Sequence, residues 1–251
     1  MMKETIHIFS SVEKLADFFA GRISESISGT AGDRFFYIAL SGGSTPRAIY
    51  KTIVENYKDE IDWSKVMIFW GDERCVTPTS DESNYKMAYD SLFKNINIPE
   101  SNIYRIEAEK DPALEAERYA EMVDLLLPHK INNPQFDMVI LGLGEDGHTA
   151  SIFPDNIHLF NSEKLFEISQ HPATKQKRIT ATGRLINNAK EVCFLVTGAS
   201  KAERVSQILQ KKAGWQDLPA SLVKPTDGEL IWMLDDLAGQ MLIKEAGNFR
   251  G

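Results

Sequence analysis

Hydrophobic residues along this chain follow two alternating patterns. Some segments carry apolar residues at three- and four-residue steps, as in residues 12–27, where Leu15, Phe19 and Ile23 fall on one helix face. Others are short, nearly continuous apolar runs, which are typical of strands covered on both faces by helices. Helices are predicted at residues 12–27, 46–57, 84–93, 112–127 and 201–211, and strands at residues 35–40, 66–70, 102–106, 136–141, 165–168, 178–181, 192–197 and 230–234, followed by a terminal helical turn.

Strands and helices that alternate with short connections indicate an α/β fold. We therefore predict a Rossmann-like, mostly parallel sheet flanked by helices, in one catalytic domain spanning residues 1–251. The stretch 155–182 is less regular and could form a small additional lobe covering one edge of the site. The sequence shows no internal repeat and no low-complexity linker.

Composition and charge narrow the possible functions. The 251 residues are 43% hydrophobic and 25% charged, as in ordinary globular proteins, and the formal net charge is −8. Nucleic-acid binding requires a basic stripe, which this acidic sequence does not show. No nucleic-acid partner is therefore predicted, and an anionic substrate must be held by a few local cations.

The chain carries few signals for metal binding, secretion or assembly. Cys75 and Cys193 are its only cysteines, and their spacing suggests neither a metal site nor a disulfide framework. The N-terminus lacks the features of a signal peptide, and no apolar run is long enough to span a bilayer. No sustained heptad pattern is present. We predict a cytoplasmic protein, with no membrane partner, that is a monomer.

Residues 136–154 form the most informative segment. An apolar run stops at glycines, which permit a tight turn and a close ligand approach, and the segment then presents Asp146 and His148. Thr149 is expected to cap a following short helix. Ligands bind at the carboxyl ends of strands in open parallel sheets. A lone loop histidine is often a surface or capping residue, but a carboxylate two residues away, between glycines, favours Asp146 and His148 as catalytic residues.

A second candidate loop follows the strand predicted at residues 35–40. Its paired glycines expose backbone N–H groups, its hydroxyls add donors, and Pro46 marks a helix N-terminus that favours an anion. The loop is not a Walker sequence, and such a segment alone is often only a turn. The candidate phosphate-binding residues here are Ser41, Gly42, Gly43, Ser44 and Thr45.

Charged residues follow two more predicted strands. Asp72 and Arg74 come after the strand at residues 66–70, where a solvated charge cluster is the alternative reading. Lys201 lies near a helix start after the strand at residues 192–197, and Arg178 could supply a second cation for a phosphate. If the sheet is parallel, these loops share its carboxyl edge with Asp146 and His148.

Several segments together resemble the 6-phosphogluconolactonase family, within the larger group that includes glucosamine-6-phosphate deaminases and ribose-5-phosphate isomerases. They follow the family's order over most of the chain. The matching segments are SGGSTP at residues 41–46, GDER at 71–74, SNY at 83–85, GLGEDGHTASIFP at 142–154, RIT at 178–180 and TGASKA at 197–202. The resemblance implies hydrolysis of 6-phosphoglucono-1,5-lactone in the oxidative pentose phosphate pathway, without a metal or organic cofactor.

Two differences separate the chain from the deaminase branch. Deaminases carry Asn-Glu-Pro shortly after the histidine, where this chain has residues 151–154, SIFP; they also carry Asp-Glu-Tyr where this chain has residues 72–74, DER. A phosphosugar isomerase or deaminase remains one alternative, and a non-catalytic sugar-phosphate sensor is another. Dinucleotide binding is weaker, because Asp146 and His148 interrupt the glycine fingerprint.

These residues suggest a mechanism for lactone hydrolysis. His148 is expected to take a proton from the attacking water and return it to the leaving ring oxygen, while Asp146 orients the imidazole or stabilises its charged form. The glycine–serine loop would hold the phosphate, with Arg178 and Lys201 neutralising it. Asp72 and Arg74 are expected either to contact the substrate or to pair with each other.

Overall fold

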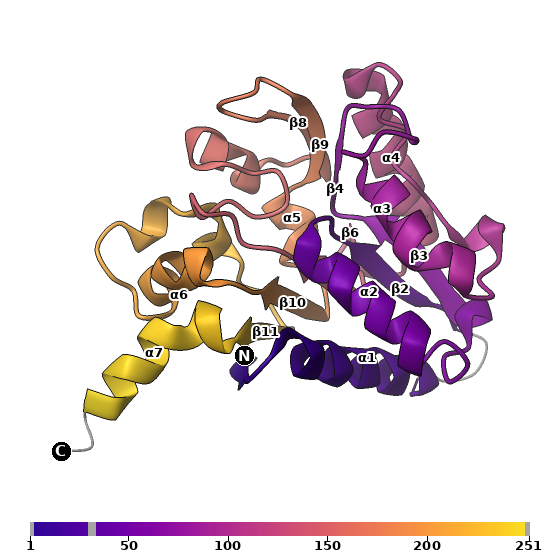
Figure 1. Ribbon diagram of the computed structural model, residues 1–251. Coiled ribbons are helices and arrows are strands. Elements are labelled where there is room, and N and C mark those ends of the chain that lie inside the picture. Colours follow the sequence, from indigo (N-terminus) through magenta and orange to yellow (C-terminus); the bar gives the residue numbers. More distant parts are fainter. Residues whose placement is uncertain (1–2, 30–33, 249–251) are drawn as a thin grey trace.

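Six parallel strands form the main sheet of the protein (Figure 1). The computed structural model describes residues 3–29 and 34–248. The strand order is β1-β11-β10-β7-β2-β3: after β1 at one edge, the chain runs from β2 to β3 at the other edge, and then from β7 through β10 to β11, beside β1. Its strands are β1 (Lys3–Phe9), β2 (Phe36–Leu40), β3 (Val66–Trp70), β7 (Met138–Leu141), β10 (Glu191–Val196) and β11 (Glu229–Asp235). The predicted mostly parallel α/β sheet is confirmed.

Helices connect these strands. In Figure 1, α1 and α2 lie together on one side of the sheet, and α6 and α7 lie beside β10 and β11. The α-helices are α1 (Val12–Ser28), α2 (Ser44–Asn56), α3 (Asn84–Ser91), α4 (Pro112–Leu126), α5 (Gly183–Ile186), α6 (Ala202–Leu209) and α7 (Asp236–Asn248). Short 3-10 helices are η1 (Trp63–Lys65), η2 (Phe93–Asn95), η3 (Glu100–Asn102), η4 (Pro154–Asn161), η5 (Ala199–Lys201), η6 (Trp215–Asp217) and η7 (Pro219–Leu222). Within the described ranges, no helix is both long and apolar enough to cross a membrane.

A small antiparallel sheet stands at the carboxyl edge of β3. It consists of β4 (Asp72–Arg74), β9 (Lys177–Ala181) and β8 (Phe166–Gln170), in that order. The Ala181 N–H donates to the Gly71 carbonyl at 2.7 Å, which fixes this sheet to the end of β3. A separate hairpin of two short strands, β5 (His129–Lys130) and β6 (Asn133–Pro134), precedes β7. The small sheet therefore brings residues from β8 and β9 to the edge where the parallel strands end.

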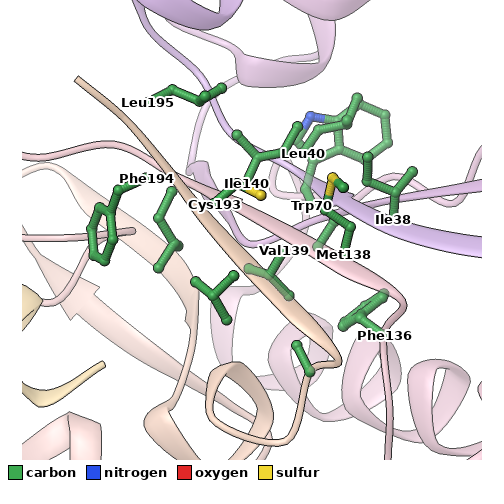
Figure 2. Close-up of a cluster of buried hydrophobic side chains, with 14 of the residues drawn as sticks. Ile38, Leu40, Trp70, Phe136, Met138, Val139, Ile140, Cys193, Phe194 and Leu195 are labelled. Carbon is green, nitrogen blue, oxygen red and sulfur yellow. The ribbon is translucent and has the colours of Figure 1, made fainter. Parts of the chain in front are cut away.

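The core lies on both faces of the central strands. Figure 2 shows apolar side chains from β2, β3, β7 and β10 packed together. All four residues of β7 are buried, because helices cover both faces of the sheet at this position. Phe194 of β10 stacks on Trp232 of β11, with ring centroids 4.0 Å apart. The end of β7 is therefore held rigidly by its neighbours, and the loop that follows it begins from a fixed point.

Most predicted elements are present, with boundaries that differ by a few residues. The strand predicted at residues 102–106 is wrong: η3 ends at Asn102, Ile103 makes only an isolated bridge with Ile68, and residues 104–106 belong to no helix or strand. Helix α2 begins at Ser44, two residues before Pro46, and the terminal helical turn is the full helix α7. Strand β1 was not predicted.

Candidate active site

The loop after β7 holds the imidazole of His148 in one orientation. Gly144 donates its N–H to the His148 carbonyl at 2.8 Å, and Gly147, at a φ of 87°, completes the tight turn. Asp146 Oδ1 accepts the His148 backbone N–H at 3.1 Å and lies 2.6 Å from His148 Nδ1. With Nδ1 held by Asp146, the other ring nitrogen, Nε2, is the one left to act on a ligand.

Asp146 is ionised at neutral pH. Burial alone would raise the pKa of Asp146, but the hydrogen bonds and positive charge of His148 outweigh that effect and lower the pKa to about 2. An ionised carboxylate can only accept hydrogen bonds, so Nδ1 carries the proton in the neutral ring. Nε2 of the neutral imidazole then presents a lone pair, which is the form required of a general base.

Gly144 allows this arrangement because it has no side chain. A Cβ atom at this position would overlap with His148 Nδ1 and Asp146 Oδ1, although the backbone conformation itself suits other residues. We expect Gly144→Ala to lower kcat about tenfold with little loss of stability, because the pair must shift while the turn remains. Steady-state kinetics and thermal unfolding would measure both effects.

Gly142→Ala is the matched control for this variant, because a Cβ on Gly142 meets no atom within 4 Å. Equal activity of Gly144→Ala and Gly142→Ala would show that the Asp146 and His148 arrangement does not depend on this close approach.

Thr149 does not cap a helix, contrary to the prediction. Its hydroxyl donates to the Gly142 carbonyl at 2.9 Å, and its backbone pairs with Ile152 in a tight turn. The turn is possible because Ala150 adopts a φ of 48°. It places Ser151, which is fully buried, where its backbone N–H donates to the Thr180 hydroxyl of β9 at 3.1 Å.

Ser151 connects the loop after β7 to the small antiparallel sheet. Its hydroxyl donates to Asp72 Oδ2 at 2.6 Å, and Arg178 Nη1 donates to the same hydroxyl at 3.3 Å. Asn84 donates from Nδ2 to the Asp72 carbonyl at 2.8 Å. Of the two predicted roles for Asp72, pairing with Arg74 is not observed, because Asp72 instead bonds to Ser151 and Asn84.

Arg74 and Arg178 are neighbours across β4 and β9, paired directly in the strand register. Arg74 Nη1 donates to the Glu82 carbonyl at 2.6 Å. The Nε atom of each arginine is buried and has no hydrogen-bond partner. Burial, followed by the charge of Arg74, lowers the pKa of Arg178. Two adjacent cations with unpaired buried N–H groups favour an anion between or beside them.

Glu73 has a structural role, because it points to the other face of β4. Its buried carboxylate accepts the backbone N–H groups of Arg74, Asn84 and Tyr85 and the hydroxyl of Ser83. Burial raises the pKa of Glu73, and these hydrogen bonds oppose that shift. The Ser83 hydroxyl also accepts the Lys86 N–H, as expected for the cap of α3. Glu73 therefore fixes the start of α3 and with it the position of Asn84.

The glycine–serine loop at the end of β2 lies at the N-terminus of α2. Gly43 is the N-cap residue, with a φ of 110°, and Ser44 and Thr45 begin the helix. Gly42 packs so closely against the Asn84 amide that a Cβ would overlap with it. Ser41 is buried, and its carbonyl accepts the Tyr50 hydroxyl. The loop thus places helix N–H groups and two hydroxyls at the carboxyl edge of the sheet.

The loop after β10 contacts the loops on both sides of it. Thr197 Oγ1 lies 2.6 Å from Thr45 Oγ1, which joins this loop to the glycine–serine loop. Gly198 adopts a φ of 96°, and its N–H donates to Asp235. Lys201 Nζ lies 3.9 Å from Glu145, in the loop that carries Asp146.

Phe153 is the common neighbour of His148, the candidate catalytic histidine, and of Arg178, a phosphate-binding candidate. The centroid of the Phe153 ring lies 4.6 Å from the centroid of the His148 ring. Arg178 Cζ lies 5.5 Å from the same Phe153 centroid. The ring thus links the loop after β7 to β9. The contacts of Ser151, Asn84, Thr45 and Lys201 join all four predicted loops to one another.

The structure thus brings the predicted residues to one edge of the sheet. Sequence reasoning missed Ser151, Asn84, Thr197 and Phe153 as site residues, although Ser151 and Phe153 lie within the segment that carries His148.

A cavity of about 970 Å³ beside α2 and α3 is lined partly by Gly43, Ser44, Arg74 and Asn84, but not by His148. The direct contacts, rather than this cavity, connect His148 with the predicted phosphate loops. Among the residues described, no group of three or more His, Cys, Asp or Glu side chains is placed to hold a metal ion.

Comparison with known proteins identifies the family. The sequence model described as glucosamine-6-phosphate isomerases/6-phosphogluconolactonase matches residues 10–232, so the chain belongs to this family of sugar-phosphate enzymes. Within it, the chain belongs with the 6-phosphogluconolactonases. The 6-phosphogluconolactonase of Haemophilus influenzae is 41% identical over 207 residues, covering 82% of this chain and 87% of that protein, and that of Synechocystis is 40% identical over 207 residues, covering 82% and 84%.

Solved structures agree with the sequence comparison. The 6-phosphogluconolactonase of Trypanosoma brucei superposes with a TM-score of 0.85 at 29% identity, covering 96% of this chain and all of that one. A monomeric glucosamine-6-phosphate deaminase superposes with a TM-score of 0.79 at 20% identity, and this likeness shows only the shared fold.

Proposed function

We propose that this protein hydrolyses 6-phospho-D-glucono-1,5-lactone to 6-phospho-D-gluconate. The observation that carries the proposal is the Asp146 and His148 pair, with Asp146 Oδ1 2.6 Å from Nδ1, at the end of the buried strand β7. Sequence relatives of about 40% identity that bear the name 6-phosphogluconolactonase support the choice of substrate.

His148 acts as the general base. Its Nε2 takes a proton from a water molecule as the water oxygen bonds to the lactone C1, forming a tetrahedral intermediate. Collapse of the intermediate breaks the bond between C1 and the ring oxygen, which takes the proton back from the imidazolium and becomes the 5-hydroxyl of the product. The new carboxylic acid releases its proton to solvent. Asp146, ionised because its pKa is about 2, stabilises the transient imidazolium.

The cations of the small sheet and the glycine–serine loop hold the substrate phosphate. Arg178 and Arg74 offer guanidinium N–H groups whose Nε atoms are unpaired, and residues 41–45 offer hydroxyls and helix N–H groups. Lys201, 3.9 Å from Glu145, supplies a further positive charge from the loop after β10. Asp72 supports the site indirectly by holding Ser151.

A coupled assay tests the proposed reaction. The lactone is generated from glucose 6-phosphate by its dehydrogenase, and the 6-phosphogluconate formed is measured through a second dehydrogenase, after subtraction of the spontaneous hydrolysis. We expect a turnover of about 10 s⁻¹ or faster, as is typical of enzymes. Ammonia release from glucosamine 6-phosphate without lactone turnover would contradict the proposal and support a deaminase; phosphosugar binding without either activity would support a sensor.

Three expectations from the sequence stay predictions. These are a monomeric state, a cytoplasmic location, and a single catalytic domain in which residues 155–182 form a minor lobe.

A further inference from the structure

His171 begins the turn between β8 and β9 and stabilises that turn with one of its ring nitrogens. The backbone N–H groups of Ala173 and Thr174 each donate to His171 Nδ1 at 3.2 Å. The His171 N–H and carbonyl also close the turn, bonding to Gln176 and Lys175. Because Nδ1 is an acceptor of two N–H groups, the neutral ring must carry its proton on Nε2.

The ring of His171 lies beside the site already described. It packs edge-on against Phe153, with centroids 5.2 Å apart at an interplanar angle of 69°. The same Phe153 ring contacts His148 at 4.6 Å and Arg178 at 5.5 Å. Nε2 of His171 has no recorded hydrogen-bond partner among the described residues, so its N–H is available to a ligand at this place.

Burial and the charges around His171 favour the neutral form of its ring. Burial, then the positive charges of Arg178 and His148, lower the pKa of His171, with Arg74 adding to the effect and Asp146 opposing it. An anion bound near Arg178 would offset part of this positive charge and raise the pKa of His171, while the neutral ring already carries the Nε2–H that would contact the anion.

We propose that His171 is an additional substrate-binding residue, whose Nε2–H donates a hydrogen bond to the phosphate of the bound sugar phosphate. The inference rests on the proposed function, because it places the phosphate near Arg178. The competing interpretation is that His171 serves only to stabilise its turn. The two interpretations separate cleanly, because the turn uses Nδ1 and the proposed contact uses Nε2.

Two substitutions distinguish these roles. His171→Asn keeps a side-chain acceptor close to the position of Nδ1, so the turn is retained, but it removes the distant N–H. His171→Phe keeps the ring against Phe153 and removes both functions. We expect both variants to raise KM for the lactone, and the dissociation constant for 6-phosphogluconate, about tenfold, with kcat within about twofold of the parent protein. His129→Asn, which removes an exposed imidazole from the β5 hairpin, is the matched control and should change neither constant.

A spectroscopic measurement tests the contact without relying on turnover. Proton and nitrogen NMR of histidine-labelled protein would follow the His171 ring during titration with 6-phosphogluconate, the stable product. We expect the ring signals to shift and the pKa of His171 to rise when the product binds. Parent-like constants in His171→Asn, or unperturbed ring signals at saturation, would overturn the proposal.

Failure of this inference and failure of the proposed function give different results. If the parent protein hydrolyses the lactone and His171→Asn behaves like it, only the role of His171 is wrong. If the parent protein does not hydrolyse the lactone, the proposed function is wrong, and the product-binding titration still decides whether His171 contacts a sugar phosphate.

Discussion

Replacing His148 by glutamine is expected to lower kcat about a thousandfold while KM changes less than about threefold. Glutamine has a similar reach and can still hydrogen-bond, but it cannot take a proton from water near neutral pH. General base catalysis typically contributes a factor of about 10² to 10⁴. Because the imidazole acts on the water rather than on the phosphate, affinity for the sugar phosphate should be retained. The coupled assay gives both constants, and calorimetry with 6-phosphogluconate gives the affinity.

His129→Gln is the control for this change. His129 is a partly exposed histidine near the C-terminus of α4, where Nε2 contacts the Asp124 carbonyl at 2.8 Å. The same chemical substitution there should leave kcat unchanged. If His148→Gln instead retained a tenth or more of the parent kcat and lost mainly affinity, His148 would be a binding residue and another group would have to activate the water.

The strand pattern explains how the proposed catalytic and phosphate-binding groups come to share one edge of the sheet. The buried parallel strand β7 has a fixed backbone, and the glycine-containing loop begins directly after it. The positions of Asp146 and His148 are therefore well defined. In β4, the alternation of side chains sends Asp72 and Arg74 to one face and Glu73 to the other. One face therefore builds the site, and the other anchors α3.

The sequence was sufficient to predict a structural element where neighbouring residues alone determine it. The apolar run 136–141 predicted the strand and the position of the loop after it, and the glycine–serine segment predicted the start of a helix. Strand β1 was missed because it is an edge strand whose residues are exposed or half-buried, so it lacks the apolar run of its neighbours. Residues 102–106 have enough apolar residues for a strand but pair with β3 through only one bridge.

Contacts between distant segments were beyond the reach of a single sequence. Asp72 and Ser151 are 79 positions apart, and nothing local indicates that the carboxylate would bond to that hydroxyl rather than to Arg74. The assignment of residues 72–74 to a loop failed for the same reason, because their strand partner β9 follows a hundred residues later. Phe153 likewise gains its importance from His148 and Arg178, which reach it from different elements.

Arg178→Ala is expected to raise KM for the phosphorylated lactone about a hundredfold, with kcat within about threefold of the parent value. A guanidinium in contact with phosphate makes charge-assisted hydrogen bonds worth about 1.5–3 kcal/mol each, and this side chain offers an unpaired, buried Nε as well as its terminal nitrogens. The preference for phosphorylated over unphosphorylated gluconolactone should fall by a similar factor, which kinetics with both lactones would measure.

Two further variants separate the charge of Arg178 from its geometry. Arg178→Lys keeps the charge but loses the planar arrangement of donors, so we expect an intermediate rise in KM of about tenfold. Lys177→Ala removes an exposed cation one residue earlier in β9, on the opposite face of the strand, and should leave the preference for phosphate intact. A preference that survives unchanged in Arg178→Ala would place the phosphate elsewhere in the site, away from the paired arginines of β4 and β9.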